Sequence, residues 1–354
     1  MNRSGKSRNG SSLVILLSSL SWNSALNDSS MCAALSAASW MSLDCPDSYP
    51  IMMSWNTSID CCNWKGVTCG DTTGDVVGLD VSCGRLQGTI HPNTSLFDLP
   101  HLQKLNLAFN YFTQQLPREI GRFSNSLTHL NLSTCWFSGQ VPSDITLLHK
   151  LVSLDLSSND YHNFTMRPHV FNNLLQNFTN LEQLSLEDVN ISSVLPDRLN
   201  ISSSSLKVLN LGNTRLQGKL PQYIFNLHSL ETLDLSYNSF NLSSNNFSGE
   251  WELDTLLSSL KNLKILLLSY NGFSVTTNNA NHYVNPGFIN LGLASCKLKV
   301  FPNSLRNMKQ LEGLDLSSNE IHGQIPHWAG EIGGNELYFL NLSHNFITGL
   351  PQFQ

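Results

Sequence analysis

The sequence predicts an α/β repeat solenoid of the horseshoe type. One short strand per repeat would join a parallel β-sheet on the concave face, and short 3-10 or helical turns would form the convex side. Three observations support this fold: a leucine motif that recurs along most of the chain, a near-constant spacing between its copies, and a Gly–Pro motif after several of the strands. Because each repeat buries its core only against its neighbours, a chain of 354 residues need not split into several globular domains.

The leucine motif is L-x-x-L-x-L-x-x-N. Copies span residues 102–110, 151–159, 230–238 and 311–319. The first strand leucine, or its equivalent, defines eleven units: Leu79, Leu105, Leu130, Leu154, Leu184, Leu209, Leu233, Leu266, Leu291, Leu314 and Leu340. Most successive spacings are 23 to 26 residues, and two are longer, 30 after Leu154 and 33 after Leu233. So regular a period is typical of a stacked repeat.

Each strand is expected to bury its leucines and to be followed by a polar residue. These polar residues stack from repeat to repeat, and we call them the polar ladder. Leu105 and Leu107 are two residues apart, so both side chains point to one face of a strand. Five residues after the first leucine stands Asn110, Asn159, Asn238, Asn271, Asn319 or Asn345 in six units. An amide there can satisfy buried backbone groups where the strand turns away. Cys135 and Cys296 occupy the same position in two units, so we expect buried, unpaired thiols.

A second motif follows the ladder, as in Leu216-Gln-Gly218-Lys-Leu220-Pro221. Glycine permits a tight backbone path, and proline blocks another ladder hydrogen bond. Short helical turns are expected next, at 143–148 and 222–227. In the 33-residue unit the motif restarts at Leu242, only a few residues after Asn238, which suggests that two repeats were fused. We expect Asn238 to keep the ladder and residues 242–247 to bulge outward. An ordinary insertion loop is the alternative.

Composition excludes several classes of function. Charged residues make up 13% of the chain and the net charge is −6, so no basic stripe is available for nucleic acid. The sequence has no H-E-x-x-H, G-x-S-x-G, G-x-G-x-x-G or P-loop motif, and its histidines lack metal spacing. It also has no apolar run of about 18 residues that could span a membrane. We therefore expect no enzyme, no cofactor and no metal.

The N-terminal region favours an extracellular protein. Basic residues before the apolar run 13–17 are typical of a signal peptide, which would occupy residues 1–30; a disordered leader is the alternative. Eight cysteines, three of them crowded into 61–69, favour a disulfide-stapled cap over a metal site. Glycosylation sequons agree with secretion; the candidates are Asn56, Asn93, Asn163, Asn177, Asn190, Asn200, Asn241 and Asn246, with further sequons at Asn131 and Asn341.

Ligands of such a solenoid usually meet its concave face. Positions facing it lie one before, one after, and three and four after the first strand leucine. Asp or Asn recurs one after that leucine, as at Asn131, Asp155, Asn210, Asp234, Asp315 and Asn341, so we interpret these residues as scaffold. The irregular residues are the candidates for ligand contact: Lys104, Phe109, His129, Glu187, Asp188, Tyr237, Tyr270, Phe339 and His344.

The motif L-x-G-x-I/L-P after the strands resembles the plant-specific leucine-rich repeat. Trp55 and the segment Cys61-Cys62-Asn-Trp64-Lys-Gly-Val-Thr-Cys69 resemble the N-terminal cap of plant receptor kinases and receptor-like proteins. The whole stretch 55–353 is similar to the plant receptor-like proteins of disease resistance and development. The resemblance implies an extracellular domain that binds a peptide, glycan or protein ligand and signals through a co-receptor kinase.

This resemblance divides the chain into a shortened cysteine cap at 45–78 and about eleven repeats at 79–354, ending without a C-terminal cap. The cap should hold a Cys62–Cys69 disulfide, because so small a cap needs a staple to cover the first repeat. Cys45–Cys61 is a weaker second pairing, since the intervening spacing is short for the family. A secreted inhibitor of cell-wall-degrading enzymes, similar to polygalacturonase inhibitors, is the alternative function, and a truncated receptor fragment without function is another.

Overall fold

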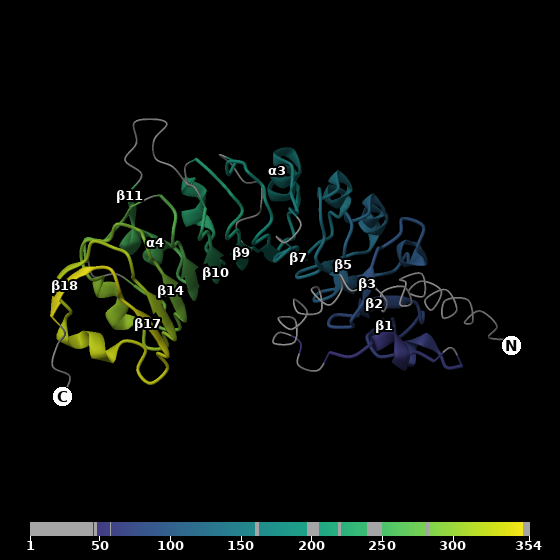
Figure 1. Cartoon of the computed structure of the whole chain (residues 1–354), viewed down its shortest axis with the longest axis horizontal. Helices are drawn as coiled ribbons and strands as arrows, with labels where there is room; N and C mark the ends of the chain where they lie inside the picture. Colours follow the sequence, from purple (N-terminus) through teal and green to yellow (C-terminus); the bar gives the residue numbers. More distant parts are fainter. Residues whose placement is uncertain are drawn as a thin grey trace, which may run out of the picture. The chain divides into compact units, whose positions relative to one another are not determined.

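The computed structural model describes residues 45, 48–56, 58–159, 163–196, 205–218, 221–238, 250–272, 274–279 and 283–349. The expected leader at 1–30 and the expected bulge at 242–247 lie outside these residues. The chain divides into two compact units, Met1–Leu181 and Glu182–Gln354. Each contains a parallel sheet of short strands, and the helical turns of each unit lie away from that sheet (Figure 1).

The first unit begins with an antiparallel pair and continues as a parallel sheet. Strand β1 (Val67–Cys69) runs antiparallel to β2 (Val76–Asp80), and the parallel strands β4 (Lys104–Asn106), β6 (His129–Asn131) and β7 (Ser153–Asp155) follow. A smaller pair joins β3 (Gln87–Gly88) to β5 (Tyr111–Phe112). The helical segments are the 3-10 helices η1 (Ile51–Ser54), η2 (Cys61–Asn63), η3 (Ser95–Asp98), η4 (Arg118–Asn125) and η5 (Ser143–Leu147), and helix α3 (Pro168–Asn177).

The second unit is built the same way. Its parallel sheet contains β8 (Gln183–Ser185), β9 (Val208–Asn210), β10 (Thr232–Asp234), β12 (Ile265–Leu267), β14 (Asn290–Gly292), β15 (Gly313–Asp315) and β17 (Phe339–Asn341). Two smaller pairs join β11 (Glu250–Glu252) to β13 (Ser274–Thr276), and β16 (His322–Gln324) to β18 (Phe346–Gly349). The helical segments are η7 (Gln222–Asn226), α4 (Leu253–Ser259), η8 (Asn303–Asn307) and η9 (His327–Glu331).

The leucine period sets the register of both sheets. Leu105 lies opposite Leu130, and Leu233 lies opposite Leu266 across the long repeat. From β2 to β15 the first strand leucine is never more than 2% exposed, so the predicted core is confirmed. On β17 the equivalent Leu340 is 53% exposed.

The polar ladder is also present. Asn159 is fully buried; its Nδ2 donates to the backbone oxygens of Leu132, Leu156 and Ser157, and its Oδ1 accepts from the N–H groups of Cys135 and Phe137. Cys135 and Cys296 are buried and unpaired as expected, and burial raises the pKa of Cys296 to about 12. Asn238 takes the ladder place in the 33-residue repeat, as predicted, with its Nδ2 on Leu211 O at 2.7 Å.

The expected helical turns at 143–148 and 222–227 appear as η5 and η7. Each of the two long repeats contains an α-helix, α3 in the first and α4 in the second. In α3, Pro168 stands in the first turn, where a missing N–H costs nothing. Its buried residues Val170, Phe171, Leu174 and Leu175 recur at helical spacing, so the helix packs one apolar stripe onto the core.

The N-terminal cap is held by a disulfide and an aromatic stack. Cys62 and Cys69 are bonded, as expected, with 5.6 Å between their Cα atoms. The rings of Trp55 and Trp64 stack with centroids 5.0 Å apart, and Trp64 is only 3% exposed. The Oδ1 atom of Asp60 accepts from Cys62 N and caps η2. These contacts cover the edge of the first repeat.

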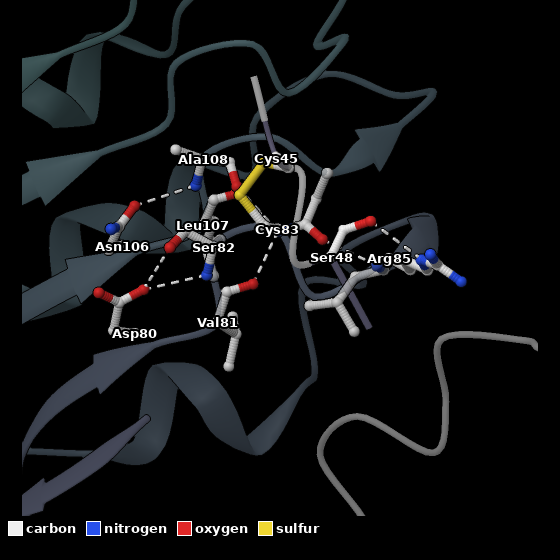
Figure 2. The surroundings of a disulfide bond; sticks show 12 residues. Cys45, Ser48, Asp80, Val81, Ser82, Cys83, Arg85, Asn106, Leu107 and Ala108 are labelled. Atoms are coloured by element: carbon white, nitrogen blue, oxygen red, sulfur yellow. Dashed lines mark hydrogen bonds between the residues drawn. A yellow bond between two sulfur atoms is a disulfide. The ribbon is translucent and has the colours of Figure 1, made fainter. Parts of the chain in front are cut away.

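The second expected disulfide is wrong, because Cys45 bonds Cys83 of the first repeat (Figure 2). Cys61 is a buried free thiol. Ser48 and Ile51 contact that repeat directly. The Nε of Arg85 donates to Ser48 Oγ, and the N–H of Ile51 donates to Gly84 O. Glycine is required at 84, because an added Cβ would lie 2.8 Å from Ile51 Cγ2. Chain packing, and not spacing along the sequence, therefore selects the partner of Cys45.

Candidate functional site

We call the inner face the face presented by the residues one before, one after, three after and four after the first strand leucine. Much of this face stabilises the backbone. In β7 the Oδ1 of Asp155 accepts from the N–H of Ser157 at 3.0 Å and from its Oγ at 2.6 Å. Asn131 makes the same two bonds to Ser133 in β6. We call this arrangement the Asx clamp. Asp234 and Asn341 make both of its bonds, and Asn210 and Asp315 make its backbone bond, accepting from the N–H groups of Gly212 and Ser317. The clamp fixes the backbone where each strand ends, which supports the scaffold interpretation.

Strand β12 departs from this pattern. Leu267 stands where other strands carry the clamp residue, and Gly292 holds the same place on the next strand. A Cβ on Gly292 would lie 3.0 Å from Leu267 Cδ2, so the glycine leaves room for the leucine side chain. Without a clamp partner, Ser269 Oγ instead accepts from Ala294 N at 3.0 Å. The inner face of the second unit is therefore apolar at this point, together with half-buried Ile265.

Two exposed tyrosines follow β10 and β12, three residues after Asp234 and Leu267. The rings of Tyr237 and Tyr270 stack with centroids 4.8 Å apart, and their side chains are 59% and 41% exposed. Their N–H groups donate to Ser269 O and Ala294 O, both at 2.9 Å, so the backbone of the pair is fixed. Both have positive φ, near 55° and 58°. The same left-handed position holds Ser, Thr or Asn in five other repeats and Cys, Phe, Asp or His in four more; the residues are Thr134, Ser158, Asn213, Ser295 and Ser318, and Cys83, Phe109, Asp188 and His344.

Carboxylates accompany the tyrosine pair. Glu187 Oε2 accepts from Asn210 Nδ2 at 3.0 Å, and Asp188 Oδ1 accepts from Asn213 Nδ2 at 2.8 Å. Burial raises the pKa of Asp234, the hydrogen bonds from Ser236 act in the opposite direction, and the charge of Asp188 adds to the rise. Burial also raises the pKa of Tyr237, with further contributions from Tyr270 and from Asp315 and Asp234.

The remaining expected contact residues are more dispersed. In the first unit Lys104 and His129 are opposite each other on β4 and β6, and Phe109 is half-buried beyond β4. The Nδ1 of His129 lies 2.9 Å from Thr128 Oγ1. In the second unit Phe339 and His344 are exposed on and after β17. The sequence prediction missed Ile265 and Leu267, although an apolar residue at a place where Asp or Asn recurs is a detectable signal.

The expected glycosylation sites differ in accessibility. Asn56, Asn93, Asn163 and Asn177 are exposed, and Asn190 is half-buried with its Oδ1 accepting from Ser192 Oγ. Asn131 and Asn341 belong to the Asx clamp, so their Oδ1 atoms are already engaged. Asn200, Asn241 and Asn246 lie outside the described residues. Accessibility therefore favours the first four positions.

A cavity of about 500 Å³ lies away from the inner face of the first unit. Its wall contains Leu116-Pro117 and Val141-Pro142, which are successive copies of the motif that follows each strand. Arg118 Nη2 lies 3.5 Å from Asp144 Oδ1 across it, so two of its charges already neutralise each other. This cavity follows from the stacking of the repeats and makes a weaker site than the tyrosine pair.

Among the residues that the structure describes, the cap contains a cluster of potential metal ligands. Asp60, Cys61 and Cys62 place their ligand atoms within 4.8 Å of one another, but the Cys62 sulfur is consumed by its disulfide with Cys69. This group therefore cannot act as a three-ligand metal site. Across the part of the chain that the structure describes, no helix has the length and apolar character needed to cross a bilayer.

Family profiles match along the chain. The Leucine rich repeat N-terminal domain matches residues 41–70, which include most of the cap. The Leucine Rich Repeat matches residues 101–123, 126–148, 205–227, 229–259 and 310–331. These matches coincide with repeats whose strands are in register in the structure.

The chain is similar in sequence to plant receptor-like proteins. Receptor-like protein 9DC1 of Solanum pimpinellifolium is 42% identical over 203 residues, covering 55% of this chain and 23% of that protein. Receptor-like protein 41 of Arabidopsis thaliana is 32% identical over 302 residues, covering 77% of this chain and 32% of that protein. The chain thus spans roughly a quarter to a third of the length of these relatives.

The chain is also similar in fold to solved structures of plant receptors. The ectodomain of the Arabidopsis thaliana receptor kinase GASSHO1/SCHENGEN3, in complex with CASPARIAN STRIP INTEGRITY FACTOR 2, has a TM-score of 0.54 at 26% identity and covers 74% of this chain and 32% of that chain. A TDR receptor has a TM-score of 0.56 at 25% identity and covers 75% of this chain and 47% of that chain. The repeats, the cap and these relatives together identify the chain as a leucine-rich-repeat protein similar to the plant receptor-like proteins.

Proposed function

We propose that the chain is an extracellular ligand-recognition domain that binds a peptide on the inner face of its second unit. The observation that carries this proposal is the exposed stack of two neighbouring tyrosines, Tyr237 and Tyr270, at a backbone position that holds Ser, Thr or Asn in five of the other nine repeats. Exposed, rigid aromatic side chains are the groups that most often dominate binding energy at protein interfaces.

An extended peptide suits this surface better than a compact small molecule. The inner face is a row of parallel strands, and its exposed features repeat at the strand spacing of about 4.8 Å. A peptide lying across the strands can therefore contact several repeats in succession, and concave repeat surfaces are commonly used in this way. The receptor-like names of the relatives agree with such a role. By the same resemblance, the domain would act at the cell surface and signal through a co-receptor kinase.

The test is selection of peptide binders by the disulfide-bonded chain, secreted into a bacterial periplasm so that the N-x-S sequons created by the asparagine variants carry no glycan. Random dodecapeptides displayed on phage are the probe, and selected sequences are synthesised for affinity measurement. The Y237N/Y270N double variant carries a residue type that this solenoid already uses at Asn213 in the same conformation, so folding is preserved. Tyr283→Asn removes an exposed tyrosine that lies outside the inner-face positions and is the matched control.

Selected peptides should bind the wild type and the Tyr283→Asn variant equally. Binding to Y237N/Y270N should be at least about tenfold weaker, because a centrally placed aromatic residue contributes about 1–2 kcal/mol or more. Absence of enrichment, or equal affinity for the double variant, would overturn the proposal.

A further inference from the structure

The strand register sets a row of four residues across the inner face of the second unit. Asp234 on β10 lies opposite Leu267 on β12, which lies opposite Gly292 on β14 and then Asp315 on β15. Leu267 and Gly292 form an apolar floor, and a carboxylate stands at each end of it. The Tyr237–Tyr270 pair follows directly along β10 and β12.

The negative charges of this row are not needed for the fold. Asn131 makes the Asx clamp with bonds of 2.9 and 2.8 Å, and Asp234 makes it with bonds of 2.8 and 2.6 Å. An amide therefore serves the scaffold as well as a carboxylate. At Asp234 the charge is also unfavourable for stability, because the residue is only 7% exposed and burial raises its pKa. A buried charge without a structural purpose is more often found at functional sites.

No basic side chain of this face compensates the carboxylates. The inner-face positions of the second unit, all of them described, include Glu187, Asp188, Asp234 and Asp315 but neither lysine nor arginine; His344 is the single residue there that can become cationic. Beside this face two lysines stand two residues before a first strand leucine, and both are engaged in ion pairs, whereas exposed Arg215 and Lys297 stand six residues after that leucine, beyond the ladder position. Lys207 Nζ lies 2.7 Å from Glu182 Oε2, and Lys264 Nζ lies 2.7 Å from Glu231 Oε2.

Tyrosine faces attract cations. The negative face of an aromatic ring binds an ammonium or guanidinium group within about 6 Å. The cap of this protein already contains such a contact, with Lys65 Nζ placed 4.1 Å from the centroid of the Tyr49 ring. On the inner face of the second unit, the exposed rings and the nearby carboxylates would attract the same kind of group.

We infer that the inner face of the second unit selects a cationic peptide, with an arginine or lysine side chain placed against the Tyr237–Tyr270 pair. The inference rests on the proposed function and specifies its ligand. The methylene stem of the bound side chain lies on Leu267 and Gly292, and its head group meets the tyrosine rings in the field of Asp234 and Asp315. Amphipathic side chains of this kind bury their stems on apolar surface in the same way.

The first unit offers a contrast within the same chain. Its strands carry the Asx clamp at Asn131 and Asp155, but Lys104 and His129 stand together on the inner face of β4 and β6. The positions equivalent to Tyr237 and Tyr270 hold Cys83, half-buried Phe109, Thr134 and Ser158, so these four positions carry a single aromatic ring and no stacked pair. Cation selection is therefore expected of the second unit and not of the first.

The test uses the peptides selected on the secreted wild-type chain. Their sequences should be enriched in arginine or lysine relative to the starting library. Each enriched arginine is then replaced by citrulline, which keeps the shape of the side chain and removes its charge. The protein variants are D234N and D315N, which keep the clamp, with D155N as the matched control because it makes the same change in the first unit.

Citrulline replacement should weaken binding about tenfold, and D234N/D315N should weaken the parent peptide to a similar degree while leaving the citrulline peptide unaffected. D155N should change neither. Raising the salt concentration should weaken only the parent peptide, because partly exposed charges are screened. Peptides that are neutral or acidic, yet still lose affinity for Y237N/Y270N, would overturn cation selection and leave the proposed function standing. Peptides indifferent to Y237N/Y270N would instead overturn the proposed function.

Discussion

Replacing Asn159 by leucine should open the repeat around it without displacing the rest of the unit. Asn159 Oδ1 is the acceptor for the N–H groups of Cys135 and Phe137, each at 3.1 Å, and all of these residues are fully buried. Leucine fits the space but leaves both donors without a partner. An orphaned buried donor costs about 1–3 kcal/mol, so the two together cost about 2–6 kcal/mol, with about 4 kcal/mol as the central value.

Native-state hydrogen exchange measures this effect locally, since repeat proteins open in segments. A loss of about 4 kcal/mol corresponds to roughly a thousandfold faster exchange at the amides of Cys135 and Phe137. Asp155→Asn, in the same repeat, removes a charge and retains the hydrogen bonds of Asp155. In this control the amides of Cys135 and Phe137 should exchange at the wild-type rate. Unchanged protection of both amides in Asn159→Leu would refute the assignment of the ladder as an energetic element.

Further predictions concern thiols, the cap and pH. Cys135 and Cys296 should resist alkylation at about pH 8 until the chain is unfolded, because burial raises the pKa of both thiols and the thiolate is the reactive form. Cys62→Ser should destabilise the cap by about 2.5 kcal/mol, because it opens a short disulfide-closed loop. Fluorescence of the Trp55–Trp64 stack would report the unfolding of the cap, with Cys61→Ser as the control. An unfolding transition that does not shift in Cys62→Ser would contradict the prediction. Asp234→Asn should gain stability relative to the wild type as the pH rises from about 4 to about 7. The raised pKa of Asp234 stabilises the wild type at low pH, and this contribution is lost as the pH rises through the pKa of the folded state. Urea titrations at several pH values would measure the two free energies of unfolding, and a difference that does not move in favour of the variant over this range would contradict the prediction.

The sequence was sufficient to predict the repeat because the repeat is local. A leucine pair such as Leu105 and Leu107 must point to one face, and an amide at Asn110 must satisfy the turning backbone, whichever partners the chain later meets. The same local reasoning placed Cys135 in the core and Asn238 in the ladder of the long repeat. It also set the inner-face positions, from which Tyr237 and Tyr270 could be selected as irregular residues.

What depends on neighbouring repeats could not be predicted from one repeat at a time. The stacking of Tyr237 on Tyr270 and the space that Gly292 leaves for Leu267 arise between strands that are distant in sequence. The partner of Cys45 was mispredicted for the same reason: Cys61 is nearer along the chain, but the segment around Ile51 packs on Gly84 and brings Cys45 beside Cys83. The repeat pattern fixes which side chains enter the core, whereas the packing of one chain segment on another decides which surface groups and which sulfur atoms meet.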